Sequence, residues 1–91
     1  MITLDYDEYI AIQRTILDRC SKGTITGNDI SSIPSEYDSA QSIYRVSIRI
    51  TELDQPELTC IVRIAEENDL KYYTTIENAQ EYIILYTLNQ Q

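Results

Sequence analysis

The chain has 91 residues, with fifteen acidic and seven basic side chains, no histidine and a formal net charge of −8 at pH 7. Its length predicts a single domain over residues 1–91, because domains commonly run from about 50 to 250 residues. The excess of acids argues against direct binding of nucleic acid or of an anionic membrane, since both need a basic surface.

The first predicted element is an amphipathic helix over residues 5–23. Asp5 and Glu8 stand three residues apart, as in a capping box, and acids at this end suit the helix dipole. Gly23 suits the position just after a helix. The predicted buried face follows spacings of three and four, with Tyr6, Tyr9, Ile10, Gln13, Ile16, Leu17 and Cys20.

The segment 24–41 is polar and carries acids but no base. A structureless loop of this length is unusual in a small domain, so a short strand or helical turn is expected within it. Long ordered loops often carry binding residues, which makes the acids and the tyrosine of this segment candidate contacts.

Two strands are predicted over 44–50 and 58–64, because apolar and polar side chains alternate in both. A loop at 52–56 would join them into an antiparallel hairpin with Arg45 opposite Arg63. Arginines placed across a strand pair repel each other unless an anion relieves them. The predicted sheet-face patch, on the side opposite the core, consists of Arg45, Arg49, Ile61 and Arg63.

The anion for this sheet-face patch has two alternative sources. Acids of the protein's own 24–41 segment, such as Glu36 and Asp38, would fold over the face, and exposed pairs of that kind contribute only about 0–1 kcal/mol each. In the other interpretation an acidic segment of a partner, or a second copy of the protein, supplies the charge, and the patch is a contact surface.

A third strand at 70–75 leads into a predicted C-terminal helix at 75–89, for which Thr74 and Glu77 form a capping box. A strand over 81–88 is the rival assignment, because β-branched and aromatic residues are frequent there. Together these elements predict an α+β fold of two layers, in which an N-terminal helix and a C-terminal helix accompany an antiparallel meander of about three strands. The C-terminal helix is expected to pack on one face of this sheet.

Cys20 and Cys60 are the only cysteines, and both fall on predicted apolar faces. Buried free thiols are the default there, and a disulfide between the two is the alternative. Without histidine or a CxxC pair, neither a metal site nor a cofactor is expected. Catalytic motifs such as GxSxG and GxxxxGK[ST] are also absent, so no catalytic residue is assigned and the protein is not expected to be an enzyme. No apolar run approaches about 18 residues and no signal segment is recognised, so we expect a cytoplasmic protein without a membrane span.

Tyrosine supplies every aromatic side chain, with eight Tyr and neither Phe nor Trp. A tyrosine ring beside carboxylates, as in SEYD at 35–38 and ENDLKYY at 67–73, suits docking onto arginine and lysine. The predicted partner-binding residues are Asp29, Glu36, Tyr37, Asp38, Glu66, Glu67, Asp69 and Tyr73.

The acidic stretches DYDE, SEYD and EEND, together with the size, charge and helix–sheet–helix layout, resemble the small acidic phage inhibitors of host defence, the anti-CRISPR and anti-restriction proteins. This resemblance implies a non-enzymatic inhibitor in the host cytoplasm that occupies a basic, nucleic-acid-binding site on a partner protein. Many soluble proteins are simply acidic, so the charge alone leaves other functions open. The alternative is a small assembly or regulatory subunit that forms a homodimer, or docks, through the arginine-bearing sheet face and the apolar C-terminal helix.

Overall fold

The computed structural model of the chain describes residues 4–21, 25–34, 44–51 and 53–87. Along these residues, each of two helices is followed by a pair of strands. In chain order the elements are helix α1 (Tyr6–Arg19), the 3-10 turn η1 (Gly27–Asp29), strands β1 (Ile30–Pro34) and β2 (Tyr44–Arg49), helix α2 (Gln55–Glu67), and strands β3 (Lys71–Glu77) and β4 (Gln80–Tyr86).

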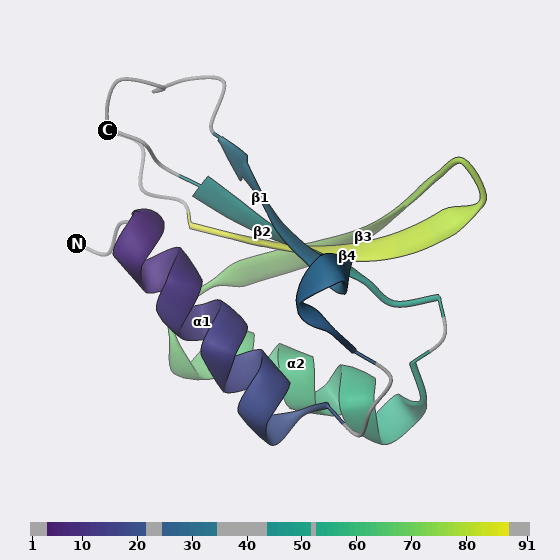
Figure 1. Cartoon of the computed structure of the whole chain (residues 1–91), viewed down its shortest axis with the longest axis horizontal. Coiled ribbons are helices and arrows are strands. Elements are labelled where there is room, and N and C mark those ends of the chain that lie inside the picture. Colours follow the sequence, from purple (N-terminus) through teal and green to yellow (C-terminus); the bar gives the residue numbers. More distant parts are fainter. Residues whose placement is uncertain (1–3, 22–24, 35–43, 52, 88–91) are drawn as a thin grey trace.

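The strands form one antiparallel sheet in the order β1-β2-β4-β3. Strand β2 pairs with β4, so the hairpin β3–β4 extends the sheet begun by β1 and β2. Figure 1 shows both helices on one side of this sheet and the β3–β4 hairpin reaching away from them. The other sheet face carries no helix of the described part of the chain, and β1 and β3 are its edges.

Helix α1 confirms the predicted N-terminal helix and its capping box. Oδ1 of Asp5 accepts the backbone N–H of Glu8 at 2.9 Å, and Oε1 of Glu8 accepts the backbone N–H of Asp5 at 3.3 Å. The helix ends at Arg19 and Cys20 is its C-cap, while the predicted terminator at position 23 lies outside the described residues. Burial raises the pKa of Tyr9 on the inner face above its ordinary value, although a hydrogen bond with Ser32 acts in the opposite direction.

Helix α2 overturns the predicted second strand at 58–64 and the hairpin built on it. Asp54 caps the helix: its Oδ1 accepts the N–H of Glu57 at 2.9 Å, and Oε1 of Glu57 accepts the N–H of Asp54 at 3.2 Å. Pro56 lies in the first turn, where a missing N–H costs no helical bond. The alternation of 58–64 misled because the same residues also have helical spacing, and the buried positions of α2 are Glu57, Ile61, Ile64 and Ala65.

The C-terminal helix predicted at 75–89 is also wrong, and the rival strand assignment is correct for residues 80–86. Thr74 and Glu77 lie inside β3 rather than in a capping box. The hairpin turns at Asn78 and Ala79, whose φ angles of 53° and 65° are those of a two-residue type I′ turn. The protein is therefore an α+β domain, as predicted, but the predicted meander of about three strands followed by a helix is wrong. Its sheet has four strands in the order β1-β2-β4-β3, and the second helix lies between β2 and β3 in the chain.

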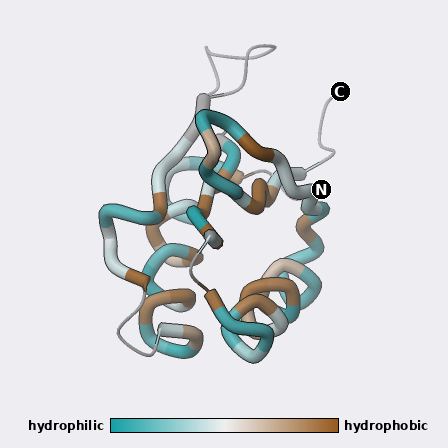
Figure 2. The backbone as a smooth tube through the Cα atoms, turned by 90° about the vertical axis from the view of Figure 1, so that its right-hand side faces the viewer, coloured by the Kyte–Doolittle hydropathy of each residue, from teal (hydrophilic) through white to brown (hydrophobic). Residues whose placement is uncertain are grey.

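The hydrophobic core lies between the helix layer and the inner sheet face. Ile16, Ile61 and Ile64 from the helices are each 0% exposed. They pack in one cluster with sheet residues that include Val46, Ile48, Ile83 and Leu85. Figure 2 shows the corresponding alternation of hydrophobic and hydrophilic residues along both helices.

A disulfide between Cys20 and Cys60 joins the end of α1 to α2, with a Cα–Cα distance of 5.6 Å. The default expectation of two free thiols is therefore wrong, and the alternative, a disulfide between the two, is correct. A strand at 58–64 gives no reason to prefer the disulfide, because it does not bring residue 60 beside the end of α1.

The position of the second cap can be tested with two alanine substitutions. We expect Asp54→Ala to lower the free energy of unfolding by about 1 kcal/mol, because it removes the N-cap of α2. Thr74→Ala, at the cap position predicted from sequence, should change it by less than about 0.5 kcal/mol because Thr74 is exposed on an edge strand. Urea unfolding of both variants gives the comparison, and equal losses would contradict the assigned start of α2.

The disulfide closes a loop with a sequence separation of 40 residues. In the chain-entropy model such a loop stabilises the fold by about 4 kcal/mol, so we expect dithiothreitol to lower the melting temperature by roughly 15–30 °C. The Cys20→Ala/Cys60→Ala variant should melt at the same temperature with and without the reductant. A wild-type melting curve that ignores dithiothreitol would count against the bond.

Candidate functional site

The predicted partner-binding residues do not gather in one patch. Glu66, Glu67 and Asp69 lie together at the C-terminal end of α2, whereas Asp29 belongs to η1 and Tyr73 to β3. The remaining three, at positions 36–38, lie outside the described residues. The described acids of the predicted surface are thus divided between two places in the fold.

Asp29 is largely committed to an internal ion pair. Nε of Arg49 donates to Oδ1 of Asp29 at 2.9 Å, and Nη2 donates to the same oxygen. The Asp29 side chain is only 13% exposed. For Arg49, therefore, an acid of the protein's own 24–41 segment is the relieving anion, and this acid is Asp29. Burial alone would raise the pKa of Asp29, but hydrogen bonds from Thr26 and from Arg49, together with the arginine charge, bring the pKa below its ordinary value.

The predicted sheet-face patch is wrong for two of its four residues, because Ile61 and Arg63 belong to α2. Ile61 is buried in the core and Arg63 is exposed on α2, so neither belongs to the sheet. Arg45 pairs across the strands with Ile33 of β1, not with Arg63. The strand register leaves Arg45 and Arg49 on the outer face, together with three tyrosines, Tyr73, Tyr82 and Tyr86. The alternative docking surface, an apolar C-terminal helix, does not exist because those residues form β4.

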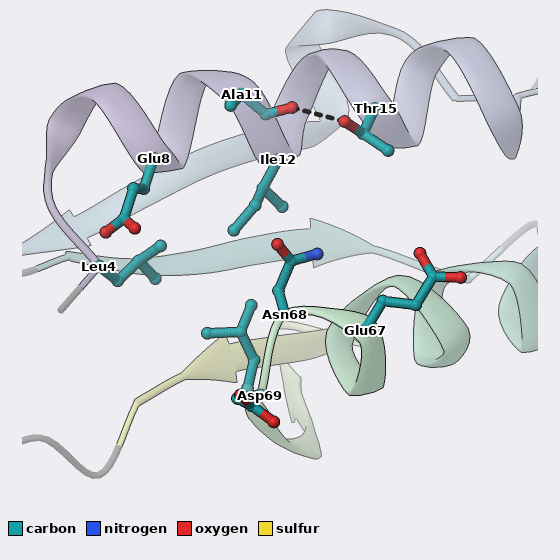
Figure 3. A pocket seen from close by; sticks show the side chains of 9 residues that line it. Leu4, Glu8, Ala11, Ile12, Thr15, Glu67, Asn68 and Asp69 are labelled. Atoms are coloured by element: carbon teal, nitrogen blue, oxygen red, sulfur yellow. Dashed lines mark hydrogen bonds between the residues drawn. The ribbon is translucent and has the colours of Figure 1, made fainter. Parts of the chain in front are cut away.

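A groove of about 280 Å³ lies between α1 and the turn that follows α2. Figure 3 shows α1 side chains on one wall and side chains from the end of α2 facing them on the other. The wall formed by the end of α2 includes Asn68, whose Nδ2 donates to the carbonyl of Ile64 at 2.8 Å. The lining combines apolar residues Leu4, Ala11, Ile12 and Leu70 with polar residues Glu8, Thr15, Glu67, Asn68 and Asp69. We call this feature the acidic groove.

The electrostatics of the acidic groove are dominated by the end of α2. Its last turn contains Glu66 and Glu67 and no base, although the negative end of a helix dipole favours cations. Arg19 relieves part of this charge, with its Nη1 2.9 Å from Oε1 of Glu67. The hydrogen bond from Arg19 holds the pKa of Glu67 below its usual range, so the carboxylate is ionised at neutral pH.

Sequence reasoning found Glu67 and Asp69 but missed Glu8 and the apolar lining. Glu8 was assigned only to the capping box, which it does form, because nothing local indicated that the start of α1 faces the end of α2. The pairing of the two helices across the groove is a tertiary feature. The groove can hold a group with an apolar stem and a positive head, as lysine and arginine have.

Among residues 4–21, 25–34, 44–51 and 53–87, no group of three or more His, Cys, Asp or Glu side chains is placed to hold a metal ion. Within the same part of the chain, no helix is long and apolar enough to cross a membrane. Comparison with known protein families, curated proteins and solved structures finds no match to this chain.

The Asp29–Arg49 pair predicts an acid-sensitive contribution to stability. The pKa of Asp29 is lower in the folded protein than its value of about 3.9 in an unfolded chain. The contribution is therefore present above about pH 4 and is lost as the pH falls through the folded pKa. We expect Asp29→Asn to cost about 1 kcal/mol at pH 7, a modest figure because Arg49 is half exposed, and to cost less at pH 3. Urea unfolding at both pH values measures this, and an equal loss at pH 7 and pH 3 would contradict the contribution of the pair.

Proposed function

We propose that this domain is a non-enzymatic, protein-binding inhibitor that captures a lysine or arginine of a partner's basic surface in its acidic groove. The observation that carries the proposal is the acidic end of α2, where Glu66 and Glu67 stand without a base in the last turn. The proposal keeps the acidic surface inferred from sequence but moves its centre to Glu8, Glu67 and Asp69 around the groove.

The end of α2 is electrostatically unfavourable for the isolated domain. An acid at the negative end of a helix typically costs about 0.3–1 kcal/mol when exposed. This cost applies to the exposed Glu66, whereas Arg19 offsets it for Glu67. A cation from a partner reverses the sign of this interaction, because it meets carboxylates and helix carbonyls together. The arrangement therefore favours a bound state over a free one.

The shape and chemistry of the groove support the same occupant. Leu4, Ile12 and Leu70 offer apolar contact for a methylene stem. Glu8, Glu67 and Asp69 bring negative charge to the groove for the charged head. Arg19 already engages both oxygens of Glu67, and the Asp69 carboxylate points away from α1 (Figure 3), so a bound cation must share the first and draw the second inward. Hydrogen bonds between oppositely charged groups are about twice as strong as neutral ones, so the rim provides orientation as well as attraction.

The charge of the whole chain supports a basic partner. A formal net charge of −8 attracts a basic surface within a Debye length of about 8–10 Å and speeds the encounter. The class likeness to phage anti-CRISPR and anti-restriction proteins makes a nucleic-acid-binding effector in the host cytoplasm the proposed target. Cytoplasmic thiols are kept reduced, so in that compartment binding must not require the Cys20–Cys60 bond.

A titration with a defined probe tests the groove. We expect an arginine-rich peptide to shift the backbone NMR signals of Thr15, Asn68 and Leu70 in the groove. The Glu67→Gln/Asp69→Asn variant should weaken this binding about tenfold or more, as the loss of two charge-assisted contacts requires. Asn is acceptable at position 69, where φ is 58°, because it tolerates the left-handed region.

The matched control removes the same amount of charge elsewhere. Asp18→Asn/Glu81→Gln changes two exposed acids that do not line the groove, and it should weaken peptide binding less than about threefold through net charge alone. Equal effects in the two double variants would show that only the overall charge matters and would reject the groove as the site.

The partner class needs a separate measurement. We expect the protein to recover a basic, nucleic-acid-binding protein from host lysate in the absence of DNA, and to lose it when DNA competes or when the groove acids are neutralised. Recovery that is indifferent to DNA, to salt and to Glu67→Gln/Asp69→Asn would overturn the proposed target.

A further inference from the structure

Strand β3 is an edge strand with an unusual amount of exposed apolar surface. Within the described part of the chain, four large hydrophobic side chains are exposed, and three of them, Tyr72, Tyr73 and Ile76, belong to β3. Ile76 is the most exposed at 70%. Exposed edge strands with apolar side chains readily pair with another strand, so β3 is a candidate for pairing with a strand of another chain.

Strand β3 has few of the devices that usually protect an edge. Its pairing with β4 is continuous from Lys71 to Glu77, without a bulge, and it contains no proline. The opposite edge, β1, is shorter and ends in Pro34. Lys71 and Glu77, the only charged residues of β3, stand at its two ends, where they leave the middle of the strand open.

The turn geometry determines which backbone groups of β3 face outward. In a two-residue type I′ hairpin the residues flanking the turn, here Glu77 and Gln80, exchange both backbone hydrogen bonds. Hydrogen-bonding direction alternates along an antiparallel strand. The N–H and C=O groups of Tyr72, Thr74 and Ile76 therefore point away from β4.

We propose that β3 pairs antiparallel with β3 of a second copy of this chain, about a two-fold axis through Thr74. In this register Lys71 stands opposite Glu77 of the second copy, and the reverse contact is formed by symmetry. Tyr72 stands opposite Ile76, and Tyr73 opposite Thr75. Aromatic–β-branched pairs and opposite charges are the stabilising cross-strand combinations, so the strand is complementary to itself.

The register follows from two requirements. Outward-facing backbone groups of one copy must meet outward-facing groups of the other. Tyr72, Thr74 and Ile76 of one copy must therefore face residues of this same set, so the two-fold axis can pass only through a residue and not between two residues. Shifting the centre to Tyr73 leaves Glu77 without a partner strand, and shifting it to Thr75 does the same to Lys71. Only the register centred on Thr74 overlaps the whole strand and forms both ion pairs.

The paired sheet would run continuously through both copies, with both helix layers on the same face, because opposite residues in an antiparallel pair share a face. A two-fold contact of this kind closes on itself and produces a dimer rather than a filament. The interface uses none of the groove residues that carry the proposed function, so either proposal can fail without the other.

Charge reversal provides the first test, measured by sedimentation equilibrium at micromolar to millimolar concentration. We expect the wild type to dimerise. Lys71→Glu and Glu77→Lys should each weaken the dimer roughly tenfold or more, because each places like charges opposite one another at two symmetric contacts. An equal mixture of the two variants should form a heterodimer as tightly as the wild type, since every contact then joins opposite charges. A wild type that stays monomeric, or a mixture no tighter than its components, overturns the proposal.

Proline and amide exchange provide the second test. Thr74→Pro removes an outward N–H and leaves the β3–β4 ladder intact, so we expect a folded monomer. In the wild type, the amides of Tyr72, Thr74 and Ile76 should exchange more slowly as the concentration rises. Those of Tyr73 and Thr75, which already face β4, should not change. Concentration-independent exchange at all five amides would contradict strand pairing even if the Thr74→Pro variant does not fold.

Discussion

Both helices bury their apolar faces against the same side of the sheet, and the other features of the molecule depend on this packing. Ile16 of α1 and Ile61 and Ile64 of α2 meet Val46 and other sheet residues in one cluster. Burying a side chain of this kind contributes about 1.5–3 kcal/mol, far more than any surface ion pair. Because all of this burial lies on one side, no helix of the described residues covers the other sheet face or the β3 edge.

The helix layer also creates the acidic groove. When α2 packs beside α1, its C-terminal turn comes to face the start of α1 and brings Asp69 to the same groove as Glu8. Neither helix would form this site alone, because each contributes one wall. The Arg19–Glu67 pair, at the groove itself, and the Cys20–Cys60 bond connect the same two helices. The fold thereby brings three of the fifteen acidic side chains, Glu8, Glu67 and Asp69, to the lining of one groove.

The outer sheet face and the β3 edge differ in how far their side chains are paired or covered. Arg49 is paired with Asp29, so this part of the outer face is neutralised within the protein. Tyr73 packs edge-on against Tyr86 with ring centroids 5.7 Å apart, which gives the outer face some cover of its own. The β3 edge has no such cover from the described residues, and its exposed Ile76 makes it the part of the sheet most suited to association.

How much could be foreseen varies with the range of the interactions involved. The sequence by itself determined α1, since an apolar period of 3.6 and the Asp5–Glu8 box are local and need no distant partner. It also contained the cap of α2, Asp54 with Glu57, but 58–64 fits strand and helix periods alike, and local pattern cannot choose between them. The turn at Asn78 and Ala79 lacks the glycine that marks most type I′ hairpins. Only the tertiary structure decided that β2 pairs with β1 and β4, that Asp29 meets Arg49, and that two helix ends form a groove, because these contacts join residues far apart in the chain.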